Sequence, residues 1–187
     1  MEIEKKNRVV EFMKTYWLYV VVGIMVFSMS MMFAFLASVN NSVPVGTSTV
    51  KFFMPMTDAY VVKDFSNSEL QLNETLNQWE AHLSVDLTSE NGDVLAILDG
   101  VVASVDYDVL EGNSITINHS NGLVATYSSL SSDILLKAGD RVKGGDKIGE
   151  ASDSATSELD LGKHLCLTMK LNDKPVDPNL YLDLQSK

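Results

Sequence analysis

Residues 94–127, VLAILDGVVASVDYDVLEGNSITINHSNGLVATY, decide the fold. They divide into short runs rich in β-branched residues, and Asp99-Gly100, Glu111-Gly112-Asn113 and Asn121-Gly122 mark turns between the runs. In residues 114–118 polar and apolar side chains alternate, so one face of that strand should be buried and the other solvated. Short strands with frequent glycine turns predict an all-β domain, built as an antiparallel sandwich or barrel-like sheet.

The neighbouring segments extend this pattern in both directions. Residues 59–62 form a further strand candidate, whereas the apolar side chains between Leu70 and Trp79 are expected to line a helical turn or a packed loop. The glycine-rich residues 138–149 match no phosphate-binding spacing, so we expect two tight turns around a short strand. Residues 51–187 have the length of one domain.

A long uncharged segment precedes the domain. Residues 17–37 contain no charged side chain, and 21 helical residues are enough to cross a hydrocarbon core of about 30 Å. A cleaved signal peptide is the alternative, but its apolar part is typically about 7–15 residues long and ends in small residues. Phe35-Leu36-Ala37 is a poor cleavage site, so the segment is predicted to be one uncleaved transmembrane helix.

The flanking charges predict the orientation of this helix. Four basic residues lie within residues 1–16, and none follows the helix until Lys51. Because cytoplasmic flanks carry the excess of Lys and Arg, residues 1–16 should be a cytoplasmic tail. Residues 38–50 are then a tether, and residues 51–187 an extracytoplasmic domain.

The charge of the chain and its cysteine content argue against a nucleic-acid partner and exclude an intrachain disulfide. The whole chain carries a net charge of −11, and the first 16 residues contribute four basic and three acidic groups, so the rest of the chain carries −12. An acidic ectodomain argues against nucleic acid as a partner. Cys166 is the only cysteine, which rules out an intrachain disulfide.

The most informative motif for function is Gly162-Lys163-His164-Leu165-Cys166. Residues two apart on a strand lie on the same face, so His164 and Cys166 should point to the same side. His82 and Asp86 form an upstream H-x-x-x-D pair. The pattern resembles a zinc-hydrolase signature in which one imidazole has become a thiol. His119, just before the Asn121-Gly122 turn, is instead expected to be a surface side chain.

The chain resembles the LytM-type (lysostaphin-like) zinc endopeptidases over about 130 residues, with the markers in the family's order. This resemblance implies an antiparallel β-sandwich with a groove. Its markers are residues 52–55, 82–86, 92–97, 99–102, 119–122, 127–130, 139–149, 162–167, 176–178 and 181–182.

The resemblance also implies roles for individual residues. In the family, the H-x-x-x-D pair and the last His of H-x-H hold zinc, which here corresponds to His82, Asp86 and Cys166. The first His of H-x-H, here His164, assists catalysis. Ser129 stands where the second assisting His is expected.

These replacements weaken the catalytic prediction. Zinc accepts thiolate, so His82, Asp86 and Cys166 could still bind it, but a second anionic ligand makes the metal a weaker Lewis acid. The alternative is that Cys166 is a small buried apolar residue and no metal binds. The Ser129 hydroxyl does not titrate near neutral pH, and losing one electrostatic donor can cost roughly 10²–10³ in rate. We therefore expect efficient hydrolysis to be lost.

One short tail, one membrane span and one degenerate LytM domain resemble the stage II sporulation protein Q family. This resemblance implies a forespore membrane protein whose domain lies in the intermembrane space. Its implied partner is the ring-forming stage III sporulation protein AH, in a channel or zipper that supports engulfment and forespore development. The alternative is a zinc peptidoglycan endopeptidase, weakly or fully active, with zinc as cofactor and peptidoglycan as substrate.

Overall fold

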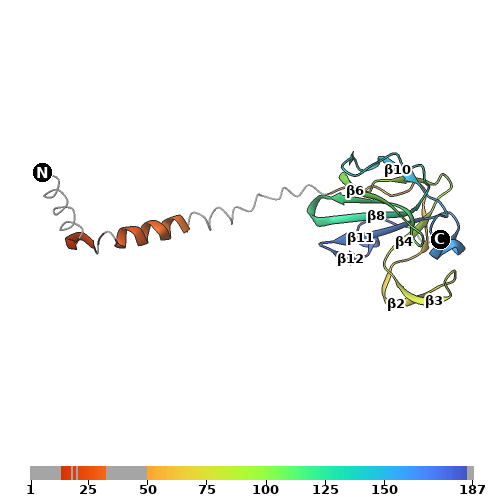
Figure 1. Cartoon of the computed structure of the whole chain (residues 1–187). Helices are drawn as coiled ribbons and strands as arrows, with labels where there is room; N and C mark the ends of the chain where they lie inside the picture. Colours follow the sequence, from red (N-terminus) through yellow and green to blue (C-terminus); the bar gives the residue numbers. More distant parts are fainter. Residues whose placement is uncertain (1–13, 18, 20, 33–49, 185–187) are drawn as a thin grey trace. The chain divides into compact units, whose positions relative to one another are not determined.

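The computed structural model describes residues 14–17, 19, 21–32 and 50–184 (Figure 1). The chain divides into two compact units, Met1–Thr49 and Val50–Lys187. In the first unit, one helix, Lys14–Met32, is long and apolar enough to cross a membrane. Its 19 residues correspond to about 28 Å of helix. Positions 33–37 of the expected span and positions 38–49 of the expected tether lie outside the described residues.

The second unit is built of antiparallel strands around one large sheet. Eight strands form this sheet, in the order β1-β4-β11-β8-β7-β6-β9, with β12 paired to β11. Two smaller sheets pair β10 with β5 and β2 with β3. The bounds are β1 Tyr60–Lys63, β2 Ser66–Asn73, β3 Gln78–His82, β4 Val85–Thr88, β5 Asp93–Leu95, β6 Gly100–Asp108, β7 Gly112–His119, β8 Leu123–Leu130, β9 Arg141–Val142, β10 Lys147–Glu150, β11 Leu165–Leu171 and β12 Lys174–Val176. The prediction of an all-β antiparallel domain is confirmed.

The predicted turns form where residues with positive φ allow them. Between β7 and β8, Asn121 and Gly122 have φ values of 61° and 74°, the left-handed pair that Asn-Gly adopts readily. At the β6–β7 turn, Gly112 has φ 75°, and an added Cβ would lie 2.2 Å from Ser154 Oγ. The turn therefore needs glycine for its conformation and for the close approach of residue 154.

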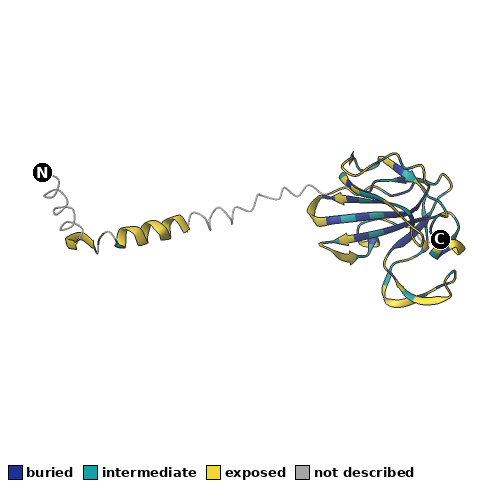
Figure 2. Cartoon of the chain, in the orientation of Figure 1, coloured by how far each residue is buried: buried dark blue, intermediate teal, exposed yellow. Residues whose placement is uncertain are grey.

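The core lies against one face of the large sheet (Figure 2). Tyr127 on β8 is completely buried, and its hydroxyl accepts a hydrogen bond of 2.9 Å from the backbone N–H of Ile97. The buried apolar cluster comprises Met56, Val85, Leu87, Val94, Ala96, Ile97, Leu98, Val102, Ile115, Ile117, Leu123, Ala125, Tyr127, Leu130, Val142, Ile148, Leu165, Leu167, Met169 and Leu182.

Within residues 50–184, three short 3₁₀ helices interrupt the strands: η1 Ser120–Gly122, η2 Thr156–Leu161 and η3 Pro178–Leu180. The glycine-rich segment forms the expected turns around β9. Asp140 Oδ2 accepts from the Lys137 N–H, and Asp146 Oδ2 accepts from the Lys143 N–H, at 3.0 and 2.8 Å.

The segment between Leu70 and Trp79 differs from the expectation of a helical turn or packed loop. It belongs to a hairpin of β2 and β3, and both Leu70 and Trp79 are exposed. The expectation was wrong because the apolar residues of β2 alternate with polar ones, a strand pattern, but face solvent rather than the core.

Candidate functional site

The candidate site begins with His82, the last residue of β3. Its Nδ1 lies 2.9 Å from the backbone oxygen of Asp64. Because a carbonyl oxygen only accepts, Nδ1 carries the proton and donates, and Nε2 faces the opposite way. Nε2 lies 3.1 Å from Asp86 Oδ2 and 3.0 Å from Ser84 Oγ. The H-x-x-x-D pair is therefore assembled as predicted.

A glutamate that sequence reasoning missed completes this cluster. Glu158, on η2, is mostly buried, and its Oε1 lies 2.8 Å from Lys63 Nζ and 3.5 Å from His82 Nε2. Its Oε2 lies 3.6 Å from His164 Nε2. No local motif marks this residue in the sequence. It reaches the site because η2 is held against two hairpin turns.

Hydrogen bonds on both sides fix the position of η2. The backbone N–H of Asp160 donates to Thr75 Oγ1 at 3.0 Å, which ties η2 to the β2–β3 turn. Thr156 Oγ1 and Ser157 Oγ donate to the backbone oxygens of Val109 and Leu110, at 2.7 and 2.8 Å. These bonds tie η2 to the β6–β7 turn. The η2 segment is thus fixed between the two turns, beside the site.

The charges within the site depend strongly on one another. Burial alone would lower the pKa of His82, but hydrogen bonds to Asp86 and Glu158 outweigh it and raise that pKa to about 9. Burial would raise the pKa of Glu158, yet His164, His82 and Lys63 hold it far below its usual range. Burial would lower the pKa of Lys63, but its bond to Glu158 raises it. Burial would likewise lower the pKa of His164, but Glu158 and the Gly162 backbone oxygen raise it, so without a metal the two carboxylates face Lys63 and two imidazoles with raised pKa values.

The donor set nevertheless fits a zinc ion. His82, Asp86 and Glu158 each offer a ligand atom, and the three atoms lie within 4.8 Å of one another. Asp86 is completely buried, and neither of its carboxylate oxygens accepts a well-aligned hydrogen bond. Ligands at about 2.0–2.2 Å in a tetrahedron lie about 3.4 Å apart, close to the 3.1 and 3.5 Å separations from His82 Nε2. His82, Asp86 and Glu158 could therefore hold zinc, which when bound would supply a Lewis acid.

Cys166 lies next to this cluster but its sulfur is not part of it. In the sheet, Cys166 pairs with Asp86 on β4 and with Ser128 on β8, and it is only 5% exposed. Burial, followed by the charges of Asp86 and Glu158, raises the pKa of its thiol well above the usual value. Cys166 is a neutral thiol at physiological pH. Its role as third ligand stays a prediction, and Glu158 is the alternative that the structure adds.

The two positions expected to assist catalysis differ in what they can do. His164 is completely buried; its Nδ1 donates to the Gly162 backbone oxygen at 2.8 Å, and its Nε2 lies 3.6 Å from Glu158 Oε2, just beyond hydrogen-bond distance. Ser129 is also completely buried, with φ 59°, and its hydroxyl donates to the Ser152 backbone oxygen at 2.8 Å. The Ser129 hydroxyl is thus committed to the backbone, whereas His164 keeps a free nitrogen near Glu158.

The expectation for His119 was wrong. This side chain is buried, and its Nδ1 donates to the backbone oxygen of Asp99 at 3.1 Å. It is covered because β6 begins opposite it at Gly100, where an added Cβ would lie 2.8 Å from Nδ1. It lines a cavity beside Arg141 that is distinct from the site of His82.

The site opens into a cavity of about 340 Å³ between the β2–β3 hairpin, the β6–β7 turn and η2. Glu80 and Glu111 join Glu158 in lining it. Burial, followed by repulsion from Glu158 and Asp108, raises the pKa of Glu111. The cavity therefore presents acidic walls to any occupant.

Residues 80–178 match peptidase family M23, and the chain belongs to this family. It is 28% identical over 157 residues to stage II sporulation protein Q of Bacillus subtilis (strain 168), covering 77% of this chain and 55% of that protein. It is 30% identical over 136 residues to an uncharacterized metalloprotease of Buchnera aphidicola subsp. Baizongia pistaciae (strain Bp), covering 71% of this chain and 35% of that protein. The chain thus spans about half, or less, of the length of these relatives.

Solved structures of a SpoIIQ complex and of an M23-fold peptidase are also similar to this chain. A crystal structure of a complex of SpoIIIAH and SpoIIQ matches with a TM-score of 0.61 and 25% identity, covering 70% of this chain and 99% of the matched chain. Lysostaphin from Staphylococcus simulans matches with a TM-score of 0.54 and 22% identity, covering 67% of this chain and 50% of that chain. The second likeness shows the fold alone. The prediction of a LytM-type domain similar to stage II sporulation protein Q is confirmed.

Proposed function

We propose that this chain is a membrane-anchored M23-fold protein that binds another protein and does not hydrolyse peptidoglycan. Its partner is a ring-forming protein like stage III sporulation protein AH. The pair forms a channel or zipper between the forespore and the mother cell, which supports engulfment and forespore development. The observation that carries this proposal is the likeness to SpoIIQ, which recurs in the solved complex with SpoIIIAH.

The proposed topology follows the helix and its flanking charges. Residues 1–16 form the cytoplasmic tail, residues 17–37 the span, residues 38–50 the tether and residues 51–187 the domain in the intermembrane space. The helix Lys14–Met32 supports a membrane anchor, and the basic residues before it support a cytoplasmic N-terminus.

Three features of the site support the absence of catalysis. The Lys63 ammonium already pairs with Glu158, so a metal would have to compete for that carboxylate. The Ser129 hydroxyl is committed to the Ser152 backbone oxygen. Loss of one transition-state donor costs roughly 10²–10³ in rate. Cys166 is a neutral thiol rather than an imidazole.

Binding to the proposed partner tests this function. The full chain, reconstituted in lipid nanodiscs, would be immobilised and exposed to the ectodomain of the stage III sporulation protein AH homologue from the same organism. We expect saturable binding, with lysostaphin as an M23-fold control that does not bind. If a folded partner shows no binding at concentrations up to about 100 μM, the proposal is overturned.

The second candidate is a zinc peptidoglycan endopeptidase, favoured by the donor separations around His82 and by the free Nε2 of His164. In that case His82, Asp86 and Glu158 or Cys166 would hold the metal, and His164 would move a proton. Peptidoglycan hydrolysis distinguishes the two candidates.

A further inference from the structure

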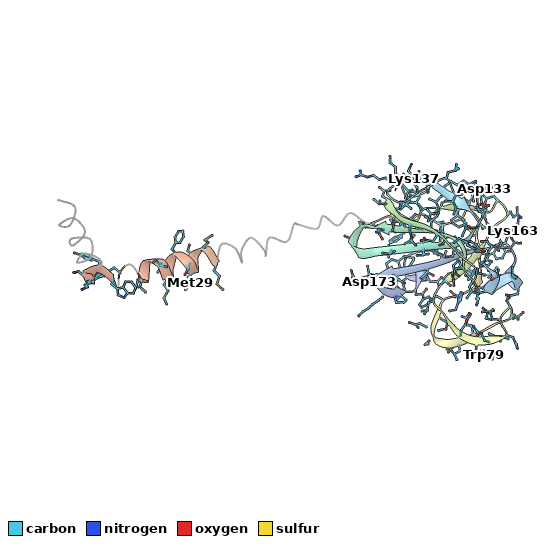
Figure 3. All side chains as sticks on the ribbon, in the orientation of Figure 1. Met29, Trp79, Asp133, Lys137, Lys163 and Asp173 are labelled. Atoms are coloured by element: carbon cyan, nitrogen blue, oxygen red, sulfur yellow. The ribbon has the colours of Figure 1, made fainter. Side chains whose placement is uncertain are left out.

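The β2–β3 hairpin carries its apolar side chains on the face that meets solvent. Leu72 and Trp79 are directly opposite each other across the two strands, and they are 42% and 66% exposed. Leu70, two residues before Leu72 on the same strand, is 61% exposed. Figure 3 shows Trp79 at the outer side of the hairpin, away from the large sheet. We call the surface of Leu70, Leu72 and Trp79 the hairpin face.

The opposite face of the hairpin is polar and is turned toward the site. Asn73 and Glu80 alternate with the apolar residues, and Asn73 Nδ2 donates to Glu80 Oε1 at 2.9 Å. Both residues line the cavity beside His82. The hairpin thus inverts the usual arrangement, in which the apolar face of a sheet is covered and the polar face is solvated.

This arrangement has to be held from outside, because an isolated two-stranded hairpin is marginally stable in water. Gln71 Nε2 donates to the backbone oxygen of Asp64 at 3.0 Å, and the turn is bonded to η2 through Thr75. These bonds present three large apolar side chains side by side on a fixed support. Single exposed apolar residues are ordinary, but a contiguous group with a tryptophan is typical of a binding surface.

The charge around the hairpin face selects the occupant. Residues 66–82 contain no Lys or Arg, and two of their glutamates, Glu69 and Glu74, are exposed on β2 and in the β2–β3 turn, whereas Glu80 faces the cavity. A second copy of the chain, with its net charge of −11, would be repelled, and so would an anionic lipid surface. A surface that combines an apolar socket with Lys or Arg around it complements the hairpin in both respects.

We propose that the hairpin face docks a partner protein that offers an apolar socket rimmed by basic side chains, with Trp79 as the central anchor. This inference rests on the proposed function, because it assigns the surface by which the domain binds its ring-forming partner. Tryptophan is enriched among the few central interface residues whose truncation costs most of the affinity.

The test measures binding of the stage III sporulation protein AH ectodomain to the full chain in nanodiscs. The variants are Trp79→Ser, Leu72→Ser and the pair Glu69→Lys with Glu74→Lys. Leu135→Ser and Leu180→Ser are the matched controls, since these leucines are 96% and 78% exposed outside the hairpin. All positions are exposed, and circular dichroism of each variant verifies the fold.

We expect Trp79→Ser to weaken binding at least 30-fold and Leu72→Ser about tenfold. The charge reversal should slow association and reverse its dependence on salt, while both controls bind like the unaltered chain. If the unaltered chain binds and the hairpin variants bind equally well, the hairpin inference is overturned and the proposed function stands. If the unaltered chain does not bind, both are overturned.

Two further measurements test the other occupants. Sedimentation of the unaltered chain and of Trp79→Ser tests self-association, and flotation with phosphatidylglycerol vesicles tests lipid binding. A loss of either interaction in Trp79→Ser, with partner binding unchanged, would assign the hairpin face to a second copy or to the membrane and overturn the inference.

Discussion

Lys63 Nζ lies 2.8 Å from Glu158 Oε1, although the two residues are 95 positions apart in the chain. Both side chains are largely buried, and the Glu158 carboxylate also faces His82 and His164. The pair joins β1 to η2 at the centre of the site. The candidate donor set of His82, Asp86 and Glu158 therefore shares one carboxylate with the Lys63 ammonium group, and the balance between the two decides whether a metal can bind.

Removing this ammonium should strengthen metal binding. In Lys63→Met, no ammonium group competes with zinc for the Glu158 carboxylate or repels the ion. The affinity of the site for zinc should therefore rise about tenfold. Competition with a chromogenic chelator measures the affinity. Lys147→Met is the matched control, because Lys147 forms an exposed pair with Asp93 away from the site. Equal affinity in Lys63→Met and the unaltered chain would show that Lys63 does not guard the site.

The identity of the third ligand can be tested by two substitutions. Glu158→Gln should lower zinc affinity more than tenfold, because a neutral amide replaces a carboxylate. Cys166→Ala should leave the affinity within about twofold, since the sulfur lies outside the donor cluster of His82, Asp86 and Glu158. The cobalt(II) form should lack a thiolate charge-transfer band. A band that disappears in Cys166→Ala would instead assign the ligand to Cys166.

The stability of the metal-free domain should fall on the alkaline side. The pKa of His82 is about 9 in the folded chain against an ordinary 6.5, so its stabilising contribution is complete below pH 6.5 and lost as pH rises through 9. The full effect is on the order of 3 kcal/mol. Urea unfolding with a chelator at pH 6 and pH 9.5 measures it.

His82→Gln is the control for this pH dependence, because a residue that does not titrate should flatten it. Glu158 acts in the other direction: its depressed pKa stabilises the fold above its ordinary 4.5, and this contribution is lost on acidification. Unfolding free energies that stay constant from pH 6 to 9.5 would contradict the charge assignment of the site.

The Tyr127 hydroxyl should contribute measurably to the stability of the core. In Tyr127→Phe, the buried backbone N–H of Ile97 loses its acceptor, which costs about 1–3 kcal/mol of unfolding free energy. Tyr107→Phe is the control, since that side chain is 64% exposed. A change below 0.5 kcal/mol in Tyr127→Phe would mean that this bond is replaced by another acceptor.

The sequence predicted strands and turns correctly where the alternation of polar and apolar residues and the turn-forming residues indicate the same strand boundaries. Residues 114–118 lie within β7, and the Asn121-Gly122 turn forms as expected. The β2–β3 hairpin was missed because its apolar residues do not face the core. His119 was missed because its burial depends on Gly100, which β-sheet pairing brings next to it.

In the site, too, residues within a short motif were predicted, whereas residues brought in by contacts distant in sequence were not. His82 and Asp86 were found because a short spacing marks them, and the motif around His164 lies on one strand. Glu158 and Lys63 carry no such signal; η2 and β1 bring them to the site through contacts distant in sequence. The family resemblance implied that Ser129 and Cys166 replace expected histidines, which stays a prediction, but nothing in the sequence indicated the ion pair of Lys63 and Glu158 beside His82.

We propose that this domain keeps the M23 fold without M23 hydrolysis. The most direct measurement is mass-spectrometric detection of muropeptides released from purified peptidoglycan by the full chain with saturating zinc. Lysostaphin serves as the positive control on its own substrate. We predict no more release than from the His82→Ala/Asp86→Ala variant. Release by the unaltered chain that disappears in this variant would contradict the claim and establish a zinc endopeptidase.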